Sequence, residues 1–372
     1  MKKYLALLLS MVLALSLLTA CGGGDSAESE ESADKVEVGI VLPTKDESRW
    51  IQDEASFTTA LENAGFTSEV KYSMGSTATE LSNVEDLVER GIKVLVLCSP
   101  DAKAAGAAVK TAKDNNVTVI CYDRLVSGTD DVDYFVTFDS YAIGKAQGQY
   151  LLDKFAGKKD VPLYMYAGDA EDANSFLLFT GAWSVLGNAV KSGQFSIQNC
   201  PAVAGFAGKE LDAAKNHDDL EKILRTINTE WDPSKAAALA EANLNANKKG
   251  DVAVLAPNDG TARAISDVFA ANKEVKSFVI TGQDADYASL KAIQEGKQSM
   301  TVRKDTSELA AATCAMAQKI LAGESPETNS EYNNGVKDIP SFGAGFTVVD
   351  AVNLPDLISE GIYSQDEIDA AK

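Results

Sequence analysis

From Val36 onward the chain alternates short apolar runs with longer segments of helical periodicity. Runs such as VEVGIVL, IKVLVLC and VTVIC have almost no polar positions, and several of the helical segments that follow them end at glycine or asparagine. Strands that are apolar on both sides and are joined by helices are typical of parallel sheets covered on both faces. The alternation therefore predicts an α/β fold built from doubly wound parallel sheets.

The repeats are too numerous for one compact sheet. The chain has 372 residues and 45 % apolar residues, enough for two domains with cores of their own. We therefore predict two doubly wound lobes. Residues 204–230 interrupt the rhythm with polar and charged sequence, and we predict an insertion there with a short amphipathic helix near Leu220 to Ile227.

The first residues have the features of an export signal. Lys2 and Lys3 precede an apolar run from Tyr4 to Leu18, which is shorter than the roughly 20 residues of a membrane-spanning helix. The run leads into Leu-Thr-Ala-Cys, which resembles the lipobox of bacterial lipoproteins and implies lipidation of Cys21. The alternative is an ordinary signal peptide followed by an unrelated cysteine. We predict a signal peptide over 1–20.

The segment 21–35 is rich in Gly, Ser and carboxylates, so it cannot build a core. We expect it to be a flexible tether that holds the folded part outside the membrane, with the lipid as the only membrane contact. The formal charge of −21 makes nucleic acid an unlikely class of partner, because its phosphate backbone is itself anionic.

Cysteine and histidine usage argues against several kinds of site. Cys98 and Cys121 end buried-strand patterns, which favours core thiols, while the pairing of Cys200 and Cys314 stays open. There is no Cys-x-x-Cys, and the chain has one histidine, His217. A zinc site or a nucleophile–histidine pair has little to be built from, and we expect neither a metal nor a cofactor.

Polar side chains follow six of the predicted strands. Because a ligand site in an open parallel sheet lies beyond the carboxyl ends of its strands, these side chains are expected to converge. Each loop mixes carboxylates with amides or cations. The residues are Lys45, Arg49 and Trp50; Asp123 and Arg124; Asp169, Glu171, Asp172 and Asn174; Asn258 and Asp259; Gln283, Asp284 and Asp286; and Arg303, Lys304 and Asp305.

Such a mixed set favours a neutral, polyhydroxylated ligand. Each sugar hydroxyl can donate to a carboxylate and accept from a cation or amide, in charge-assisted bonds worth about 1.5–3 kcal/mol each. Trp50 and Trp231 offer flat faces for a pyranose ring. No glycine-rich phosphate-binding motif is present. A glycosidase would need a carboxyl of raised pKa, and we expect the neighbouring cations to lower those of Asp172 and Asp284 instead.

In their order along residues 36–365, eight motifs resemble the type I sugar-binding proteins of bacterial ABC importers, closest to xylose-binding and multiple-monosaccharide-binding proteins. These motifs are LPTKDESRW, VICYDRLVSGTDDVDYFVTFD, DANS, WDPSKAAA, APNDG, TGQDAD, TVRKDTSELA and NNGVKDIPS. The resemblance implies the type I periplasmic-binding-protein fold, with two lobes joined by a three-segment hinge and the sugar in the cleft. We place the lobes at 36–140 plus 304–338 and at 141–303 plus 339–372.

The resemblance also implies which residues bind the sugar. The ligand-binding set is Lys45, Arg49, Trp50, Asp123, Arg124, Asp172, Asn174, Trp231, Asn258, Asp284 and Lys304. Where the family has Asp-Asn-Asn, this chain has Asp172-Ala173-Asn174, so the middle asparagine is lost. The long 204–230 segment leaves the loop shape near Trp231 in doubt.

Some of these residues also have structural readings. Trp50 can anchor its helix in the core, and Asp123 can orient Arg124 without touching ligand. Asp259 is a candidate helix cap, and Asp286 and Asp305 are expected to be caps or hinge residues. Asp46 and Glu47 are expected to face water.

We therefore expect an extracytoplasmic, monomeric lipoprotein that binds an aldopyranose such as xylose, glucose, galactose or arabinose and is not an enzyme. It would deliver the sugar to an ABC permease and its ATPase, and its lobes would close by a hinge motion. The alternative is a sensor subunit that presents the sugar to a membrane receptor or histidine kinase.

Overall fold

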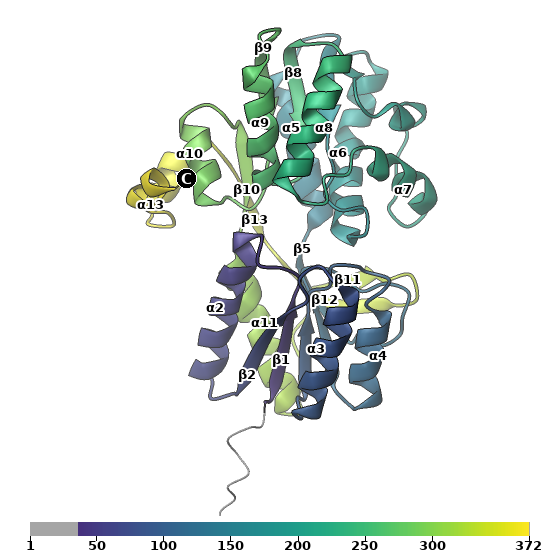
Figure 1. Ribbon diagram of the computed structural model, residues 1–372, viewed down its shortest axis with the longest axis vertical. Coiled ribbons are helices and arrows are strands. Elements are labelled where there is room, and N and C mark those ends of the chain that lie inside the picture. Colours follow the sequence, from purple (N-terminus) through teal and green to yellow (C-terminus); the bar gives the residue numbers. More distant parts are fainter. Residues whose placement is uncertain (1–35, 372) are drawn as a thin grey trace, which may run out of the picture. The chain divides into compact units, whose positions relative to one another are not determined.

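The computed structural model describes residues 36–371, which lie within one compact unit, Val36–Lys372 (Figure 1). The predictions for the signal peptide, for Cys21 and for the tether lie outside the described residues. Among the helices of the described part, none is long and apolar enough to cross a membrane.

The larger sheet has seven strands in the order β11-β12-β5-β4-β3-β1-β2. All neighbours run parallel except β11, which forms an antiparallel hairpin with β12. The strands are β1 (Val38–Leu42), β2 (Ser68–Tyr72), β3 (Val94–Leu97), β4 (Thr118–Tyr122), β5 (Tyr134–Phe138), β11 (Ser330–Asn333) and β12 (Asp338–Ala344).

Two separate cores cover the faces of this sheet, because successive side chains of a strand point to opposite sides. In β1, Ile40 packs into the core with α2 and α11, whereas Val41 packs into the other core with α3 and α4. The covering helices are α2 (Ser48–Asn63), α3 (Thr77–Glu89), α4 (Gly106–Asp114) and α11 (Thr306–Leu321). We call this sheet and its helices the N-terminal lobe.

The smaller sheet is parallel and has the order β7-β6-β8-β9. Its strands are β6 (Val161–Met165), β7 (Phe195–Ile197), β8 (Gly250–Leu255) and β9 (Val275–Ile280). The helices α5 (Ser140–Lys154), α6 (Ala173–Lys191), α8 (Pro233–Ala246) and α9 (Asp259–Ala271) pack against it in two core clusters. A further cluster joins α10 (Tyr287–Gln294), α12 (Leu354–Ser359) and α13 (Gln365–Ala370). Together they form the C-terminal lobe, and two doubly wound parallel sheets confirm the predicted fold class.

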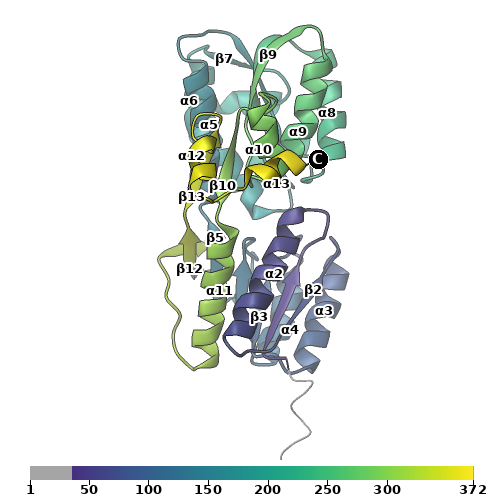
Figure 2. The ribbon, with the colours of Figure 1, turned by 90° about the vertical axis from the view of Figure 1, so that its left-hand side faces the viewer.

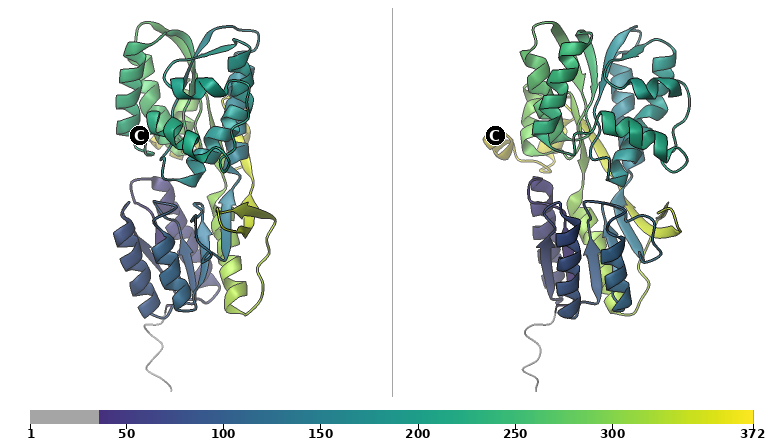
Figure 3. Two further views of the ribbon diagram at one scale, coloured as in Figure 1. Left: turned by 90° about the vertical axis from the view of Figure 1, so that its right-hand side faces the viewer. Right: turned by 45° about the vertical axis from the view of Figure 1, so that its right-hand side comes forward.

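Three segments pass between the lobes: β5 to α5, β10 to α11, and β12 to β13 (Figures 2 and 3). The strands β10 (Met300–Lys304) and β13 (Phe346–Asp350) pair with each other as an antiparallel ribbon. The last crossing differs from the sequence prediction, which placed it after residue 338. Because β12 is hydrogen-bonded to β5 from Ser341 to Ala344, the larger sheet continues to Ala344.

The 204–230 segment contains the predicted amphipathic helix, α7 (His217–Thr226), preceded by the 3₁₀ helix η1 (Pro201–Phe206). Leu220, Ile223 and Leu224 are buried in the C-terminal lobe core and follow the three- and four-residue spacing of one helix face. The helix therefore packs onto the lobe.

All four cysteines of the described residues are free and buried. Cys98 and Cys121 lie in the two cores of the larger sheet, which confirms the prediction of core thiols. Cys200 and Cys314 are unpaired as well, which answers the question that the sequence left open. Burial raises the pKa of the Cys121 thiol to about 12, so this thiol stays protonated and unreactive.

Candidate functional site

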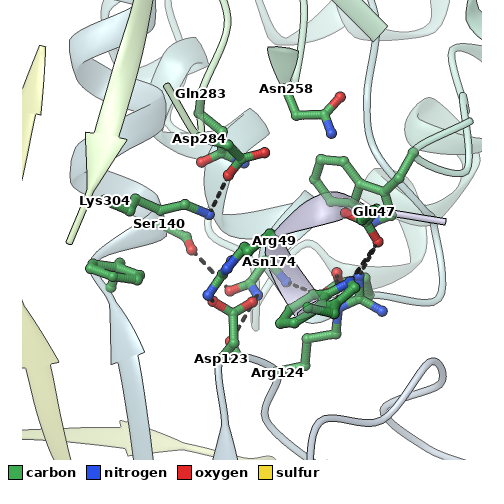
Figure 4. A pocket seen from close by; sticks show the side chains of 14 residues that line it. Glu47, Arg49, Asp123, Arg124, Ser140, Asn174, Asn258, Gln283, Asp284 and Lys304 are labelled. Atoms are coloured by element: carbon green, nitrogen blue, oxygen red, sulfur yellow. Dashed lines mark hydrogen bonds and ion pairs between the residues drawn. The ribbon is translucent and has the colours of Figure 1, made fainter. Parts of the chain in front are cut away.

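A cavity between the carboxyl ends of strands from both sheets contains nearly the whole predicted set (Figure 4). The empty space among its lining side chains is about 400 Å³, part of which is open to solvent. Every predicted ligand-binding residue except Lys45 lines it. The lining residues are Glu47, Arg49, Trp50, Asp123, Arg124, Phe138, Ser140, Asp172, Asn174, Trp231, Asn258, Gln283, Asp284 and Lys304.

Lys45 departs from the prediction, because the structure does not bring it to the cavity. It is exposed, and its ammonium nitrogen lies 4.4 Å from the centre of the Tyr72 ring. The first loop therefore contributes Arg49 and not Lys45. Lys45 lies in the connection between the end of β1 at Leu42 and the start of α2 at Ser48.

Arg49 and Asp123 form a buried ion pair at the floor of the cavity. The guanidinium Nη2 lies 2.5 Å from Asp123 Oδ2. Burial alone would raise the pKa of Asp123, but Arg49 and Lys304 outweigh it, so this pKa lies below its ordinary value. Burial opposes the charge of Arg49 too, and the carboxylates of Asp123 and Asp53 nevertheless hold its pKa well above the ordinary value. The alternative in which Asp123 orients Arg124 is not what the structure shows, because Asp123 pairs with Arg49.

Arg124 spans the cavity from one lobe to the other. Its Nε lies 3.0 Å from Asp172 Oδ2, and its Nη2 lies 3.6 Å from Glu47. Asp172 uses its other oxygen to cap α6, accepting a hydrogen bond from the Asn174 backbone N–H. The pKa of Asp172 is raised, because burial outweighs the attraction of Arg124. The expectation that neighbouring cations lower this pKa was therefore wrong.

Asn174 joins the lobes by neutral hydrogen bonds. Its amide donates to the Asp123 backbone carbonyl at 2.8 Å and accepts from the Ser140 hydroxyl at 2.9 Å. Asp123 belongs to the N-terminal lobe, whereas Ser140 begins α5, where the chain enters the C-terminal lobe. The side chain is therefore held in one orientation between the lobes.

The opposite wall carries the third ion pair, Lys304 with Asp284 at 2.8 Å. Lys304 ends β10, and its nitrogen also lies 5.6 Å from the centre of the Phe138 ring. Asn258 caps α9 by accepting from the Thr261 N–H, and it lines the cavity beside Gln283. In Figure 4 these side chains surround the same space as the arginine pairs.

Three cavity residues have a backbone conformation that L-amino acids seldom adopt. Asp123, Trp231 and Asp284 have φ angles of +62°, +59° and +104°. Such strain costs on the order of 1–3 kcal/mol per residue and tends to occur at functional sites. All three residues line the cavity, so the unusual backbone conformations are concentrated at the site.

The two tryptophans differ in their surroundings. Trp50 is 1 % exposed and packs in the core of the N-terminal lobe, and the guanidinium carbons of Arg49 and Arg124 lie 4.6 and 5.4 Å from its ring centre. The reading of Trp50 as a core anchor therefore fits, with a second role in orienting two arginines. Trp231 is half-buried and remains the candidate for stacking on a sugar ring.

Gly168 sets the position of Trp231. A β-carbon at residue 168 would lie 2.1 Å from Cζ2 of the indole, so the ring occupies space that only glycine leaves free. We expect Gly168→Ala to displace Trp231 and weaken ligand binding by about tenfold while the protein stays folded. Isothermal titration measures this. The matched control is Gly260→Ala, whose added carbon meets Pro233 at an ordinary 3.5 Å. Equal affinity in the two variants would contradict the role given to Trp231.

Sequence reasoning left four lining residues out of the set: Glu47, Phe138, Ser140 and Gln283. Glu47 was expected to face water, but it accepts a hydrogen bond from Trp50 Nε1 at 2.9 Å and approaches Arg124. That expectation was wrong for Glu47, whereas Asp46 is exposed as predicted. Gln283 is among the polar residues that follow a predicted strand, beside Asp284, but it was not placed in the ligand-binding set.

The predicted helix caps are confirmed in two cases of three. Asp286 accepts from the Ser289 N–H at the start of α10, and Asp305 accepts from the Glu308 N–H at the start of α11. Asp259 is different: Asn258 is the cap of α9, and the buried Asp259 carboxylate accepts from Gln298 and Thr301. Burial, with Asp286 and Asp284 nearby, raises the pKa of Asp259 well above its ordinary value.

The cations that line the cavity are paired with carboxylates. Each of its three cations faces a carboxylate within 3.0 Å, and a fourth carboxylate, Glu47, lies 3.6 Å from Arg124, so no cation is left unpaired for an anionic ligand. Within residues 36–371 no cluster of His, Cys, Asp and Glu has the arrangement to hold a metal ion. The arrangement suits a neutral molecule whose hydroxyls donate to carboxylates and accept from cations and amides.

Comparison with known proteins places this geometry in a family. The chain matches the periplasmic binding protein domain over residues 38–325. It is 31 % identical over 363 residues to the multiple sugar-binding periplasmic receptor ChvE of Rhizobium radiobacter, covering 95 % of this chain and 97 % of that protein. It is 28 % identical over 353 residues to the D-xylose-binding periplasmic protein of Escherichia coli, covering 95 % and 98 %.

Solved structures support the same family assignment. A carbohydrate transporter solute-binding protein of Chloroflexus aurantiacus, in complex with D-glucose, superposes with a TM-score of 0.86 at 47 % identity and covers 90 % of this chain and 98 % of its own. An ABC transporter solute-binding protein of Clostridium phytofermentans with bound β-D-glucose gives a TM-score of 0.78 at 30 % identity, covering 89 % and 99 %. With its two doubly wound lobes, its interlobe cavity and these relatives, this chain belongs to the periplasmic binding protein family and has the type I fold.

Proposed function

We propose that this protein binds a neutral monosaccharide, an aldopyranose such as xylose, glucose, galactose or arabinose, in the cavity between its lobes. The observation that carries the proposal is the set of three ion pairs, Arg49–Asp123, Arg124–Asp172 and Lys304–Asp284, around one cavity. A pyranose can insert its hydroxyls between such partners without changing the net charge of the site. Relatives that carry sugars in their names, or glucose in their structures, support this ligand class.

Binding without turnover is part of the proposal. Both oxygens of Asp172 are engaged, one by the Asn174 N–H and the other by Arg124, so the carboxyl is not free to act as a general acid. Incubation with aryl glycosides of the sugars that bind provides the test. Release of the aryl group above the buffer rate would contradict the proposal.

The test of the ligand class is isothermal titration of the purified protein against a panel of aldoses. We expect at least one aldopyranose to bind with a Kd in the micromolar range or tighter, and charged analogues such as the uronic acids to bind more weakly. Binding of another ligand class in the absence of any monosaccharide binding below millimolar would overturn the proposal.

We further propose that the sugar is delivered to an ABC permease and its ATPase, and that Cys21 is lipidated. Membership of the family and the transporter names of the solved relatives support the transport role. A receptor role is the second candidate, because one relative is named a periplasmic receptor. Neighbouring genes for a permease and an ATPase would favour the transport role.

Lipidation of Cys21 has its own test. Labelled fatty acid should be incorporated covalently into the wild-type protein and not into the Cys21→Ser variant.

A further inference from the structure

A carboxylate lies behind the cavity without lining it. Asp53 is on α2, one helical turn after Arg49, and its residue is fully buried. The Tyr122 hydroxyl donates to Asp53 Oδ2 at 2.9 Å, and Arg49 Nε lies 3.6 Å from the same oxygen. Asp53 Oδ1 and Arg49 Nε have no hydrogen-bond partner in the described part of the chain.

This position is unfavourable for a charged group. Burial raises the pKa of Asp53 to about 6, although Arg49 and the Tyr122 hydrogen bond act in the opposite direction. The folded state therefore binds the proton more tightly than the unfolded state, and Asp53 contributes less to stability as the pH rises from about 4 to about 6. An ionised Asp53 at neutral pH thus lowers folding stability. Stability therefore does not explain why a carboxylate occupies this buried position.

Arg49 supplies that reason, because it faces two carboxylates on opposite sides. Asp123, at 2.5 Å, lines the cavity, whereas Asp53 does not. A sugar hydroxyl that donates to Asp123 competes with Arg49 for the same oxygens. An arginine with only one partner would lose part of its charge compensation at that moment, in a position where its side chain is buried.

We propose that Asp53 is a positioning residue that holds Arg49 toward the bound sugar. When a hydroxyl takes over part of Asp123, Arg49 Nε closes the short distance to Asp53, and the Nη groups stay directed into the cavity. Tyr122 keeps the Asp53 carboxylate turned toward the arginine. Asp53 itself touches no ligand.

The groups around Asp53 come from three directions. They are Arg49 on the same helix, Tyr122 on β4 and Asp123 directly after it, and Lys304 at the end of β10. The pKa of Arg49 is raised, that of Asp123 is lowered and that of Tyr122 is raised, so these three keep their charge states between pH 5 and pH 8. Protonation of Asp53 in this range would remove the second partner of Arg49.

The test compares Asp53→Asn with Glu54→Gln by titration with the aldose that binds the wild type most tightly. Both changes turn a carboxylate on α2 into an amide, and both carboxylates accept from a tyrosine hydroxyl, but Glu54 bonds Tyr72 and does not contact Arg49. We expect Asp53→Asn to weaken binding about tenfold, the effect of losing one hydrogen bond to a charged group. We expect Glu54→Gln to stay within about twofold.

Two further readouts separate positioning from a structural role. We expect the melting temperature of Asp53→Asn at pH 7.5 to be no lower than that of the wild type, because the cost of burying a charge is removed. The affinity ratio of wild type to Asp53→Asn should shrink from pH 7.5 to pH 5, as Asp53 takes up its proton in the wild type. The raised pKa of Asp172 affects both proteins equally.

Equal affinity of Asp53→Asn and the wild type would overturn the inference. So would a lowered melting temperature with a constant affinity ratio across pH, because that pattern means a structural role. The inference rests on the proposed monosaccharide binding, and the wild-type titration separates the two. A wild type that binds no aldose refutes the proposed function, whereas a binding wild type with an unaffected Asp53→Asn variant refutes only this inference.

Discussion

Arg124→Ala is expected to reduce monosaccharide affinity by at least about 100-fold, roughly 3 kcal/mol. The guanidinium is buried, lines the cavity and faces Asp172 and Glu47 from two sides. Its removal takes away hydrogen-bond donors for the sugar and leaves Asp172 buried without its cation, and truncating one partner of such a pair costs about 2–5 kcal/mol. Isothermal titration measures the loss.

The matched control for this substitution is Arg225→Ala. Arg225 also pairs with carboxylates, Glu171 and Glu221, but its side chain is half exposed and does not line the cavity. Exposed pairs contribute little, so we expect affinity within about twofold of the wild type. Thermal unfolding of Arg124→Ala shows whether the fold survives, and Arg124→Lys gives an intermediate loss, because lysine keeps the charge without the planar fork. Unchanged affinity in a folded Arg124→Ala protein would contradict the site.

Asp284→Asn is the second large effect, with an expected loss of about 100-fold. Asparagine keeps the shape of the side chain and is among the residues that tolerate a positive φ, such as the +104° at this position. The change removes the charge that strengthens a hydrogen bond from a sugar hydroxyl. It also leaves Lys304, whose side chain is 8 % exposed, without its partner at 2.8 Å.

Asp251→Asn serves as the control for the loss of one carboxylate. Asp251 is exposed on β8 and bonds only Ser277 among the described side chains, far along the strand from its carboxyl end. Its replacement should leave affinity unchanged. Titration of both variants at pH 7.5 decides the matter, and a tight-binding Asp284→Asn protein would mean that Asp284 faces Lys304 and not the ligand.

Residues whose role follows from their place at a strand end were predictable. Asp123, Arg124, Asp172 and Asn258 each follow an apolar run, and the parallel topology brings the ends of such runs together. Trp231 follows no predicted strand, and the motif resemblance gave it the role of the stacking aromatic. The fold class followed from the same alternation of strands and helices.

Residues whose role depends on a turn or on packing were not predictable. Lys45 and Glu47 lie two positions apart on one loop, and the turn into α2 exposes the first and carries the second to the cavity. Trp50 is a residue type that can stack on a sugar ring, yet its own ring is enclosed by the core and by two guanidinium groups. The pKa of Asp172 depends on its burial, which outweighs the cation beside it.

The sequence by itself determined the two doubly wound lobes, the chemistry of the cavity and most of its residues. Hydrophobic periodicity, and the polar residues that follow each apolar run, can be identified from the order of residues alone. The tertiary structure alone decided which carboxylate each cation faces, that β12 extends the larger sheet to Ala344, and that Asp53 lies behind Arg49. Those outcomes depend on distances of a few ångströms between segments far apart in the chain, and on the balance of burial against charge at each site.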